Sequence, residues 1–209
     1  MERKRRLLLL GTAGALTGLA TPSLAELLDP TPRQTRGPFY PPEPPLDADS
    51  DLVHVSGREG TAKGIVTEVT GRIVDPAGDP IDSARVEIWQ CDANGRYHHP
   101  RASADGRDPY FQGFGTFTTD TDGRYRFRTI RPVPYPGRTP HIHFRVVAPG
   151  SPELVTQMYI AGHPMNAGDA IFRAAGADRH RLAVEFEPAK AGSGAARIAR
   201  FDLVAGLRG

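Results

Sequence analysis

The sequence is poor in cysteine and in long hydrophobic runs, and each shortage excludes something. The single cysteine, Cys91, cannot form an intramolecular disulfide, so packing must hold this chain together, with or without a metal. The apolar stretch Leu7–Ala20 is interrupted by glycines and is shorter than the roughly 20 apolar residues that a membrane-spanning helix needs. Helical periodicity is also scarce, and Ala170–Ala175 is expected to form at most a turn or two.

The sequence also lacks a real excess of charge of either sign. The whole chain carries +2, but residues 1–25 contribute +3, which leaves −1 over the remaining 184 residues. The basic balance therefore belongs to the leader, and the rest of the chain gives no reason to expect nucleic acid or a membrane surface as a partner. A length of 184 residues is enough for one domain with a substantial core.

Residues 1–25 have the layout of an export signal. Basic residues precede the apolar run, and Ser23-Leu24-Ala25 supplies the small residues of a cleavage site. Arg5-Arg6 followed by leucines favours the twin-arginine route, which exports proteins that have already folded, often around a cofactor. The alternative is an ordinary secretory leader that happens to be rich in arginine. Both interpretations predict a periplasmic or extracellular protein.

Short β-branched runs separated by turn residues follow the leader. Residues 26–63 are expected to form an extended N-terminal arm, because proline and acidic residues dominate its first half, and residues 64–209 one domain. With 23 glycines, 20 prolines and about eight short strands, the sequence predicts an all-β sandwich with few short helices. In the first strand, alternate residues from Ile65 to Ile73 should share one face. The expected strands are Ile65–Ile73, Val86–Trp89, Gly115–Thr119, Tyr125–Thr129, Ile142–Val147, Leu154–Ile160, Leu182–Phe186 and Ile198–Val204.

Two histidines, His141 and His143, stand two residues apart at one of these strands. Side chains at positions i and i+2 of a strand point to the same face, so the two imidazoles should project together. Paired imidazoles on a rigid strand are a common way to present ligands to a metal ion. A chance pair of half-exposed histidines is the alternative.

Two tyrosines lie where the chain can bring them to the same place. Tyr135 occupies a Pro-Tyr-Pro turn six residues before His141, and Tyr97 follows an Asn-Gly turn that would direct its phenol outward. Taken singly, each tyrosine is equally explained by an ordinary buried hydrogen bond. The order of the four residues along the chain is what favours a metal site.

At this point the sequence resembles the intradiol ring-cleavage dioxygenase family. Glycines and aliphatic residues from Val69 to Tyr97 fit the family signature, including Val86-Glu87-Ile88 and Gly95-Arg96-Tyr97. The resemblance extends over residues 35–204 and implies a Greek-key-type β-sandwich with an extended N-terminal arm. The other matching segments are Thr35-Arg36-Gly37-Pro38-Phe39-Tyr40, Tyr125–Pro132, Pro134-Tyr135-Pro136 and Arg138–Phe144.

The resemblance implies that Tyr97, Tyr135, His141 and His143 bind iron(III). Two phenolates and two neutral imidazoles suit a trivalent ion, which would lower the pKa of each phenol from its usual value near 10. The implied reaction inserts both atoms of O2 into a catechol-type diol and cleaves the ring between the hydroxylated carbons, giving a cis,cis-muconate-type product. A catechol-type small molecule and O2 are therefore the expected partners, and a homo-oligomer is compatible with the sequence.

The resemblance also implies roles for residues around the ligands. Tyr135 would accept a proton and give up its place on the metal as substrate arrives. Arg138 would stabilise negative charge on the ring, although a surface salt bridge is the alternative. Gly137 stands where protocatechuate enzymes carry a bulky aromatic residue, so a more open rim is expected. The residues that match the substrate pocket are Gln157, Tyr40 and Gly37.

Two alternatives compete with this hypothesis. The segment from Gly71 to Val86 also resembles transthyretin-like and carboxypeptidase-regulatory sandwiches, exported binding modules without a catalytic metal. Such modules have no reason to hold two tyrosines and a His-x-His pair in this order. The other alternative keeps the fold but holds zinc or copper, or has lost activity. Colour separates them, because tyrosinate bound to iron(III) is wine-red, whereas zinc protein and a metal-free module are colourless.

Overall fold

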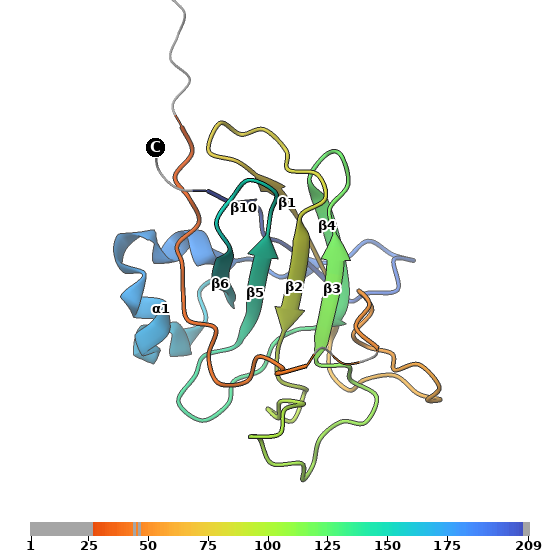
Figure 1. Cartoon of the computed structure of the whole chain (residues 1–209). Helices are drawn as coiled ribbons and strands as arrows, with labels where there is room; N and C mark the ends of the chain where they lie inside the picture. Colours follow the sequence, from red (N-terminus) through yellow and green to blue (C-terminus); the bar gives the residue numbers. More distant parts are fainter. Residues whose placement is uncertain (1–26, 44, 46, 207–209) are drawn as a thin grey trace, which may run out of the picture.

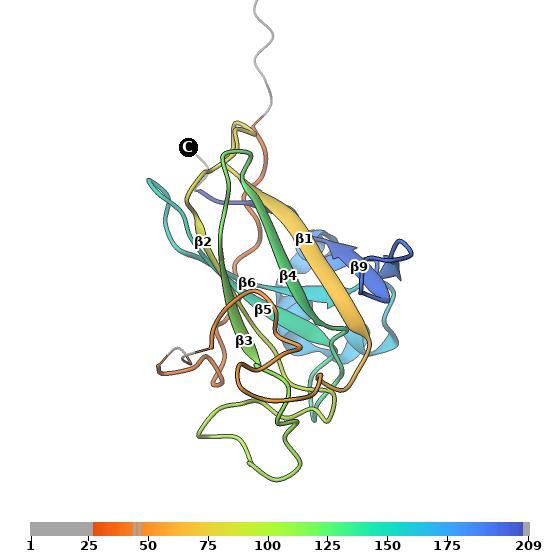
Figure 2. The same ribbon diagram turned by 90° about the vertical axis from the view of Figure 1, so that its right-hand side faces the viewer.

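The computed structural model describes residues 27–43, 45 and 47–206, which form a sandwich of two sheets (Figures 1 and 2). The predicted all-β class is therefore confirmed. The expected export signal over residues 1–25 lies outside the described residues and stays a prediction. Within the described part of the chain, no helix is long and apolar enough to span a membrane.

The first sheet is built around its longest strand, β1 (Val66–Val74). This strand pairs antiparallel with β4 (Arg124–Ile130) and parallel with β9 (Arg197–Arg200) and β10 (Leu203–Val204), while β8 (Glu187–Pro188) pairs with β9. The alternation expected for the first strand holds from Thr67 to Ile73, whose odd-numbered side chains are buried. Ile65 departs from it and is 46% exposed, because it precedes the strand and is not held in its pleat.

The second sheet has the strand order β3-β2-β5-β6-β7. Its inward face is apolar, as the period of two along each strand requires. Its outward face carries polar and aromatic side chains, among them Glu87, Trp89, His141, His143 and Gln157. The bounds are β2 (Arg85–Trp89), β3 (Phe114–Thr118), β5 (His141–Val147), β6 (Leu154–Ile160) and β7 (Ala183–Val184).

The main core lies between the two sheets. Phe144 packs edge-on against Phe201 with ring centroids 5.2 Å apart. Burying an apolar side chain of this kind stabilises the fold by about 1.5–3 kcal/mol relative to leaving it exposed. Gly71 is needed here, because a Cβ at this position would lie 2.1 Å from the carbonyl oxygen of Phe201. The other large members include Ile73, Val86, Ile88, Phe127, Ile142 and Met158.

The N-terminal arm and three short helices lie against the second sheet. Figure 1 shows the arm running along β6 and then turning across the ends of β5 and β2. The Gln34 backbone N–H donates to the Val155 carbonyl (2.8 Å), and its side chain bonds the hydroxyl of Tyr159 (2.8 Å) and the carbonyl of Ile171 (2.9 Å). The helices are η1 (Pro164–Gly168), α1 (Ala170–Ala174), which matches the one expected helix, and η2 (Gly176–Leu182).

The last two predicted strands are shorter in the structure than in the prediction. The run 182–186 keeps only β7, and the run 198–204 divides into β9 and β10 at Phe201 and Asp202. The division has a local cause: the Phe201 carbonyl accepts the Tyr125 hydroxyl, and the Asp202 carboxylate accepts the Arg72 N–H at 2.9 Å. These side-chain bonds take the place of ladder hydrogen bonds. The two-residue strand β8 was not predicted.

Candidate metal centre

The structure brings Tyr97, Tyr135, His141 and His143 together on the outward side of the second sheet. The two histidine Nε2 atoms are 3.2 Å apart, and the Tyr97 hydroxyl lies 3.4 Å from the Nε2 of His141. The Tyr135 ring centroid lies 5.5 Å from that of Tyr97 and 5.6 Å from that of His141. The proximity that the sequence predicted is therefore present, while the role of the four as ligands stays a prediction.

His141 is held with its Nε2 lone pair facing the centre. Its Nδ1 lies 2.7 Å from the Thr139 carbonyl, which can only accept, so the proton must be on Nδ1. Burial, helped by the nearby Arg138 charge, lowers the pKa of His141 to about 4. The ring is therefore a neutral donor at ordinary pH, the form that a metal requires.

His143 is oriented by stacking. Its ring lies parallel to that of Trp89, with centroids 4.7 Å apart and an interplanar angle of 6°. Its Nδ1 is buried and has no hydrogen-bond partner in the described part of the chain, so the indole face fixes the ring plane in place of a hydrogen bond. Burial, together with the neighbouring His141, lowers the pKa of His143 well below its usual value.

Tyr97 comes from a long loop at one end of the sandwich, residues 90–113, which is called the Tyr97 loop below (Figures 1 and 2). The fully buried carboxylate of Asp92 organises it. One oxygen accepts the backbone N–H groups of Asn94 and Arg96 (2.9 Å each), and the other accepts that of Asp108 (2.7 Å). Although burial would raise the pKa of Asp92, these hydrogen bonds and the nearby His98 lower it.

The Tyr97 side chain is packed on all sides and is only 4% exposed. Phe39 of the arm stacks on its ring, with centroids 4.6 Å apart and planes 20° apart. Cys91 belongs to the same aromatic cluster and donates its thiol to the Val133 carbonyl (3.7 Å). Burial raises the pKa of Tyr97 well above its usual value, so its phenol needs a cation beside it to ionise.

Tyr135 sits in a tight turn, residues 133–138, which is called the Tyr135 turn below. The Arg138 N–H closes it by donating to the Tyr135 carbonyl (2.9 Å). The phenol is half-buried, and the Arg138 Nη1 lies 3.4 Å from its oxygen. Partial burial raises the pKa of Tyr135, and the adjacent guanidinium opposes that rise. This phenol is therefore the more accessible and the more easily ionised of the two.

Arg138 is fixed by two partners on its far side. Its Nε donates to the Asp169 carboxylate (2.8 Å), and its Nη2 donates to the Gln157 amide oxygen (2.6 Å). Burial works against the charge, but the ion pair with Asp169 raises the pKa of Arg138 overall. A loosely held surface salt bridge, the alternative weighed for this residue, does not describe a side chain that is only 13% exposed.

The three predicted pocket residues lie at different distances from the centre. Gly37 is next to it, since a Cβ there would lie 3.4 Å from the Cε1 of His143, and its φ of +71° favours glycine. Gln157 pairs with His143 across β5 and β6, but its amide is occupied by Arg138, Tyr159 and the arm.

Tyr40 does not contact the four residues through its hydroxyl, which donates to the buried carboxylate of Glu87 (2.8 Å). Its ring packs edge-on against Trp89, with centroids 4.9 Å apart. Trp89 in turn stacks on His143. Tyr40 therefore supports the centre through an intervening indole, and the geometry gives no direct reason to place it in a substrate pocket.

Three important residues were missed by the sequence reasoning. Trp89 and Phe39 stack on two of the predicted ligands, and Asp169 holds Arg138. Trp89 carried a usable signal, because it is the only tryptophan and it ends an expected strand. Asp169 carried a weaker one, as an acidic residue directly before the expected helix, which is a favoured N-cap position.

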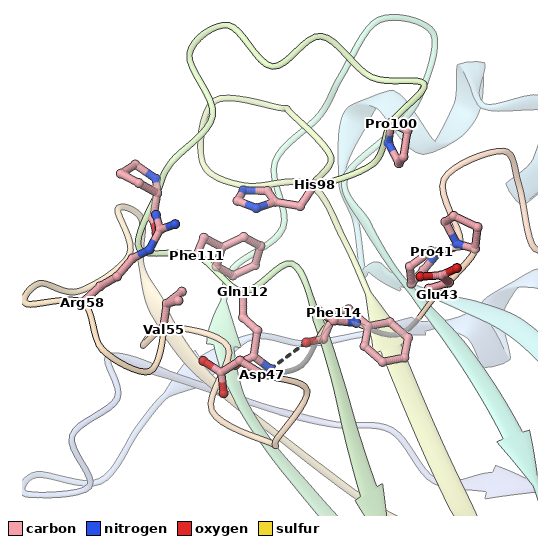
Figure 3. A pocket seen from close by; sticks show the side chains of 13 residues that line it. Pro41, Glu43, Asp47, Val55, Arg58, His98, Pro100, Phe111, Gln112 and Phe114 are labelled. Atoms are coloured by element: carbon pink, nitrogen blue, oxygen red, sulfur yellow. Dashed lines mark hydrogen bonds between the residues drawn. The ribbon is translucent and has the colours of Figure 1, made fainter.

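A cavity of about 420 Å³ lies beside the Tyr97 loop. Figure 3 shows His98, Phe111 and Gln112 along it, with the Gln112 amide donating to the Phe114 carbonyl (2.7 Å). Several prolines complete its wall, and none of the four clustered residues lines it. This hollow is therefore distinct from the centre, although the Tyr97 loop supplies part of its wall.

The donor atoms present fit a single metal ion. Two donors that each lie about 2.1 Å from an ion, at right angles or tetrahedrally, are separated by roughly 3.0 to 3.4 Å. The observed separations of 3.2 and 3.4 Å fall in that range. The described residues contain no group of three or more His, Cys, Asp and Glu that could hold a metal, so the tyrosines must complete any set built on the histidine pair. Anionic phenolate oxygens favour a hard, highly charged ion.

Comparison with known proteins agrees with this fold. The model of a family described as Dioxygenase matches residues 35–208. The chain is 40% identical over 188 residues to the protocatechuate 3,4-dioxygenase beta chain of Burkholderia cepacia, covering 85% of this chain and 79% of the relative. It is 34% identical over 158 residues to the catechol 1,2-dioxygenase of Candida albicans, covering 65% of this chain and 49% of that protein, so it spans about half that protein's length.

A solved structure extends the similarity to three dimensions. The dioxygenase domain of a dioxygenase and carbohydrate-binding fusion protein from Streptomyces sp. SirexAA-E superimposes with a TM-score of 0.66 and 33% identity, covering 86% of this chain and all of that domain. The fold and these matches together define an enzyme of the dioxygenase class. The chain belongs to the intradiol ring-cleavage dioxygenase family.

Proposed function

We propose that this chain is a non-haem iron(III) intradiol dioxygenase. It inserts both atoms of O2 into a catechol-type diol and cleaves the ring between the hydroxylated carbons, yielding a cis,cis-muconate-type dicarboxylic acid. The observation that carries the proposal is the convergence of two neutral, buried imidazoles and two phenols within a few ångströms. Family membership sets the reaction class, and the donor set supports the identity of the metal.

Tyr97, Tyr135, His141 and His143 would hold the metal. Iron(III) bound there supplies a redox-active Lewis acid that makes the ring of a catecholate reactive towards O2. The protein keeps its histidines neutral by burial, so no proton has to be removed from them before they bind. Trp89, Phe39 and the Thr139 carbonyl fix the planes of three of the four rings.

The exposed side of the centre is where a diol would approach. Tyr135 is half-buried there, and once a bound metal holds it as the phenolate, its oxygen would be the accessible base that takes a proton from an incoming hydroxyl. Arg138 lies beside it, held by Asp169 and Gln157, and places a fixed positive charge near the negative charge that develops on the ring. A charge positioned in advance does not have to reorganise during the reaction, which makes it effective.

The proposal is tested on the purified chain lacking residues 1–25. We expect about one iron per chain, a broad visible absorption band, and consumption of O2 with catechol, protocatechuate or hydroxyquinol. The ring-opened diacid should appear in equal amount, which mass spectrometry and ultraviolet absorption can follow. Stoichiometric zinc or copper in a colourless or inactive protein would contradict the proposal, and so would a product cleaved outside the diol.

We also propose that the protein acts outside the cytoplasm, after export by the twin-arginine route. The motif Arg5-Arg6 before a leucine run supports this. Replacing both arginines by lysines keeps the leader basic, so it should block the twin-arginine route and leave a general secretory route usable. Normal export of the double variant would leave the ordinary secretory leader as the explanation.

A further inference from the structure

One buried carboxylate links the predicted active-site arginine to a predicted ligand. The side chain of Asp169 is fully buried, and each of its oxygens accepts two hydrogen bonds. Oδ1 accepts the backbone N–H groups of Ile171 and Phe172 at 2.9 Å each and so caps helix α1. Oδ2 accepts two further hydrogen bonds on the opposite side, from Arg138 and Thr139. All four acceptor positions of the carboxylate are therefore used.

The two donors to Oδ2 are neighbours in sequence, and both lead to the centre. Arg138 donates its Nε at 2.8 Å, and Thr139 donates its backbone N–H at 3.0 Å. The carbonyl of the same Thr139 accepts from the Nδ1 of His141 at 2.7 Å. A single carboxylate oxygen thus fixes the guanidinium that faces Tyr135 and the backbone N–H of Thr139, the residue whose carbonyl sets the tautomer of His141.

We propose that Asp169 is the positioning residue of this active site, holding Arg138 and the backbone of Thr139 in the arrangement that the reaction needs. The proposal rests on the proposed function, because positioning is measured through turnover. Asp169 does not touch the reacting atoms, and it acts through Arg138 and His141.

Helix capping alone does not explain this residue. A five-residue helix needs one acceptor at its N-cap, and serine or asparagine supplies that as well as aspartate does. The second oxygen has no capping role, and it faces a guanidinium that is only 13% exposed. The other groups that bond Arg138, the Gln157 amide and the Tyr135 phenol, carry no formal charge while the phenol is protonated. Asp169 is therefore the counter-charge that keeps this arginine in place.

The test uses Asp169→Asn, which keeps the size and the capping ability but removes the charge and one acceptor. Its amide N–H groups face the Arg138 and Thr139 donors, so the guanidinium should lose its fixed orientation. A displacement of about 1 Å at a catalytic group can cost on the order of a hundredfold in rate. We expect kcat with the best substrate among catechol, protocatechuate and hydroxyquinol to fall roughly tenfold to a hundredfold, with a smaller change in KM.

A spectroscopic readout separates positioning from general damage. The Arg138 Nη1 lies 3.4 Å from the Tyr135 oxygen, so release of the guanidinium should shift the visible tyrosinate band while about one iron per chain remains. The matched control is Asp120→Ser, which alters an exposed aspartate that accepts two backbone N–H groups in a turn (3.0 and 2.8 Å). It should change neither kcat nor the band.

A double variant shows whether Asp169 acts through Arg138. Arg138→Gln should lower kcat, and adding Asp169→Asn to it should cost much less than Asp169→Asn costs in the wild type. Asp169→Ser, which also preserves the cap, serves as the second single variant. Full additivity, or wild-type kcat in both single variants, would overturn the proposal. Loss of the fold in both would overturn it too, since Asp169 would then be a residue of the fold. A wild type without iron or dioxygenase activity would instead refute the proposed function.

Discussion

The two tyrosines at the centre reach it from very different segments. The Tyr97 loop is long, folds around the buried Asp92 and ends in a phenol that is 4% exposed and stacked on Phe39. The Tyr135 turn is short and closed by one backbone bond, and it leaves its phenol half-buried beside Arg138. The same side chain is thus a fixed structural donor in one segment and an accessible, charge-assisted one in the other.

This difference shows how one residue type serves two chemical purposes. Burial disfavours the phenolate of Tyr97 strongly, so that side chain has little use as a proton carrier without a metal. Tyr135 meets a weaker penalty and a neighbouring guanidinium, which suits a group that exchanges a proton with substrate. The environment of each phenol, and not its distance from the histidines, separates their expected roles.

The largest effect should come from the histidines that both segments face. His141→Ala or His143→Ala leaves three donors and an open site, so we expect loss of iron and of the visible band in either variant. Metal analysis and absorption spectra measure this directly. His180→Ala, which changes an exposed histidine, is the control. Full iron and colour in either ligand variant would show that the strand pair does not hold the metal.

The sharpest test of the comparison replaces each tyrosine in turn. Tyr97→Phe should weaken iron binding and alter the colour before substrate is added. Tyr135→Phe should keep more iron, and its damage should fall on turnover by about 10² to 10⁴, the usual cost of losing a positioned base. Iron content, resting spectra, substrate-bound spectra and kcat distinguish the two. Equal loss of iron with identical substrate-bound spectra, or wild-type turnover in Tyr135→Phe, would show that the two tyrosines do not have different roles.

A third variant disturbs the Tyr97 loop and leaves the Tyr135 turn unchanged. Asp92→Ala removes the acceptor of three backbone N–H groups inside the protein, and we expect a cost on the order of 3 kcal/mol or more in the free energy of unfolding. Iron affinity should fall with it, because the loop no longer presents Tyr97. Asp105→Ala, at an exposed position of the same loop, should change stability by about 0.5 kcal/mol or less. Similar denaturation curves for both variants would contradict the scaffolding role of Asp92.

The smallest effect concerns acid stability of the metal-free chain. Burial, with a contribution from Arg138, lowers the pKa of His141 to about 4 from 6.5, so between these values the unfolded chain binds a proton that the folded chain does not. Stability should therefore fall as pH drops from about 6.5 to about 4, by up to about 3 kcal/mol from His141, and His143, whose pKa is also lowered by burial, adds to the fall. The tyrosines do not contribute, since the pKa of each is raised. Urea denaturation at several pH values in this window gives the free energy of unfolding. This free energy should depend less steeply on pH in His141→Gln than in the wild type, and an unchanged pH dependence would exclude His141 as a cause.

The features that the sequence predicted are those set by residues close together along the chain. The alternation in β1 and β4 follows from inward apolar residues, and the His-x-His pair of β5 shares a face because strands have a period of two. The proximity of Tyr135 follows from its closeness in sequence. The structure added contacts between distant residues, such as Arg138 with Asp169, Trp89 with His143, and Tyr40 with Glu87. No local pattern encodes these, because each depends on how separate segments pack. Two-residue strands such as β8 are likewise set by their partners.

The arm that passes over the second sheet has a kinetic consequence. Its bonds to that sheet join residues more than 120 positions apart, as for Gln34 with Tyr159 and Thr35 with Gln157. Closing so long a stretch of chain is entropically slow, whereas β5 and β6 are neighbours in sequence and can pair early. We therefore expect the histidine pair to exist before Gly37 and Phe39 arrive beside it. A folding intermediate without the arm would leave the donors open to the surrounding solution, and arm docking would be the step that traps a captured ion.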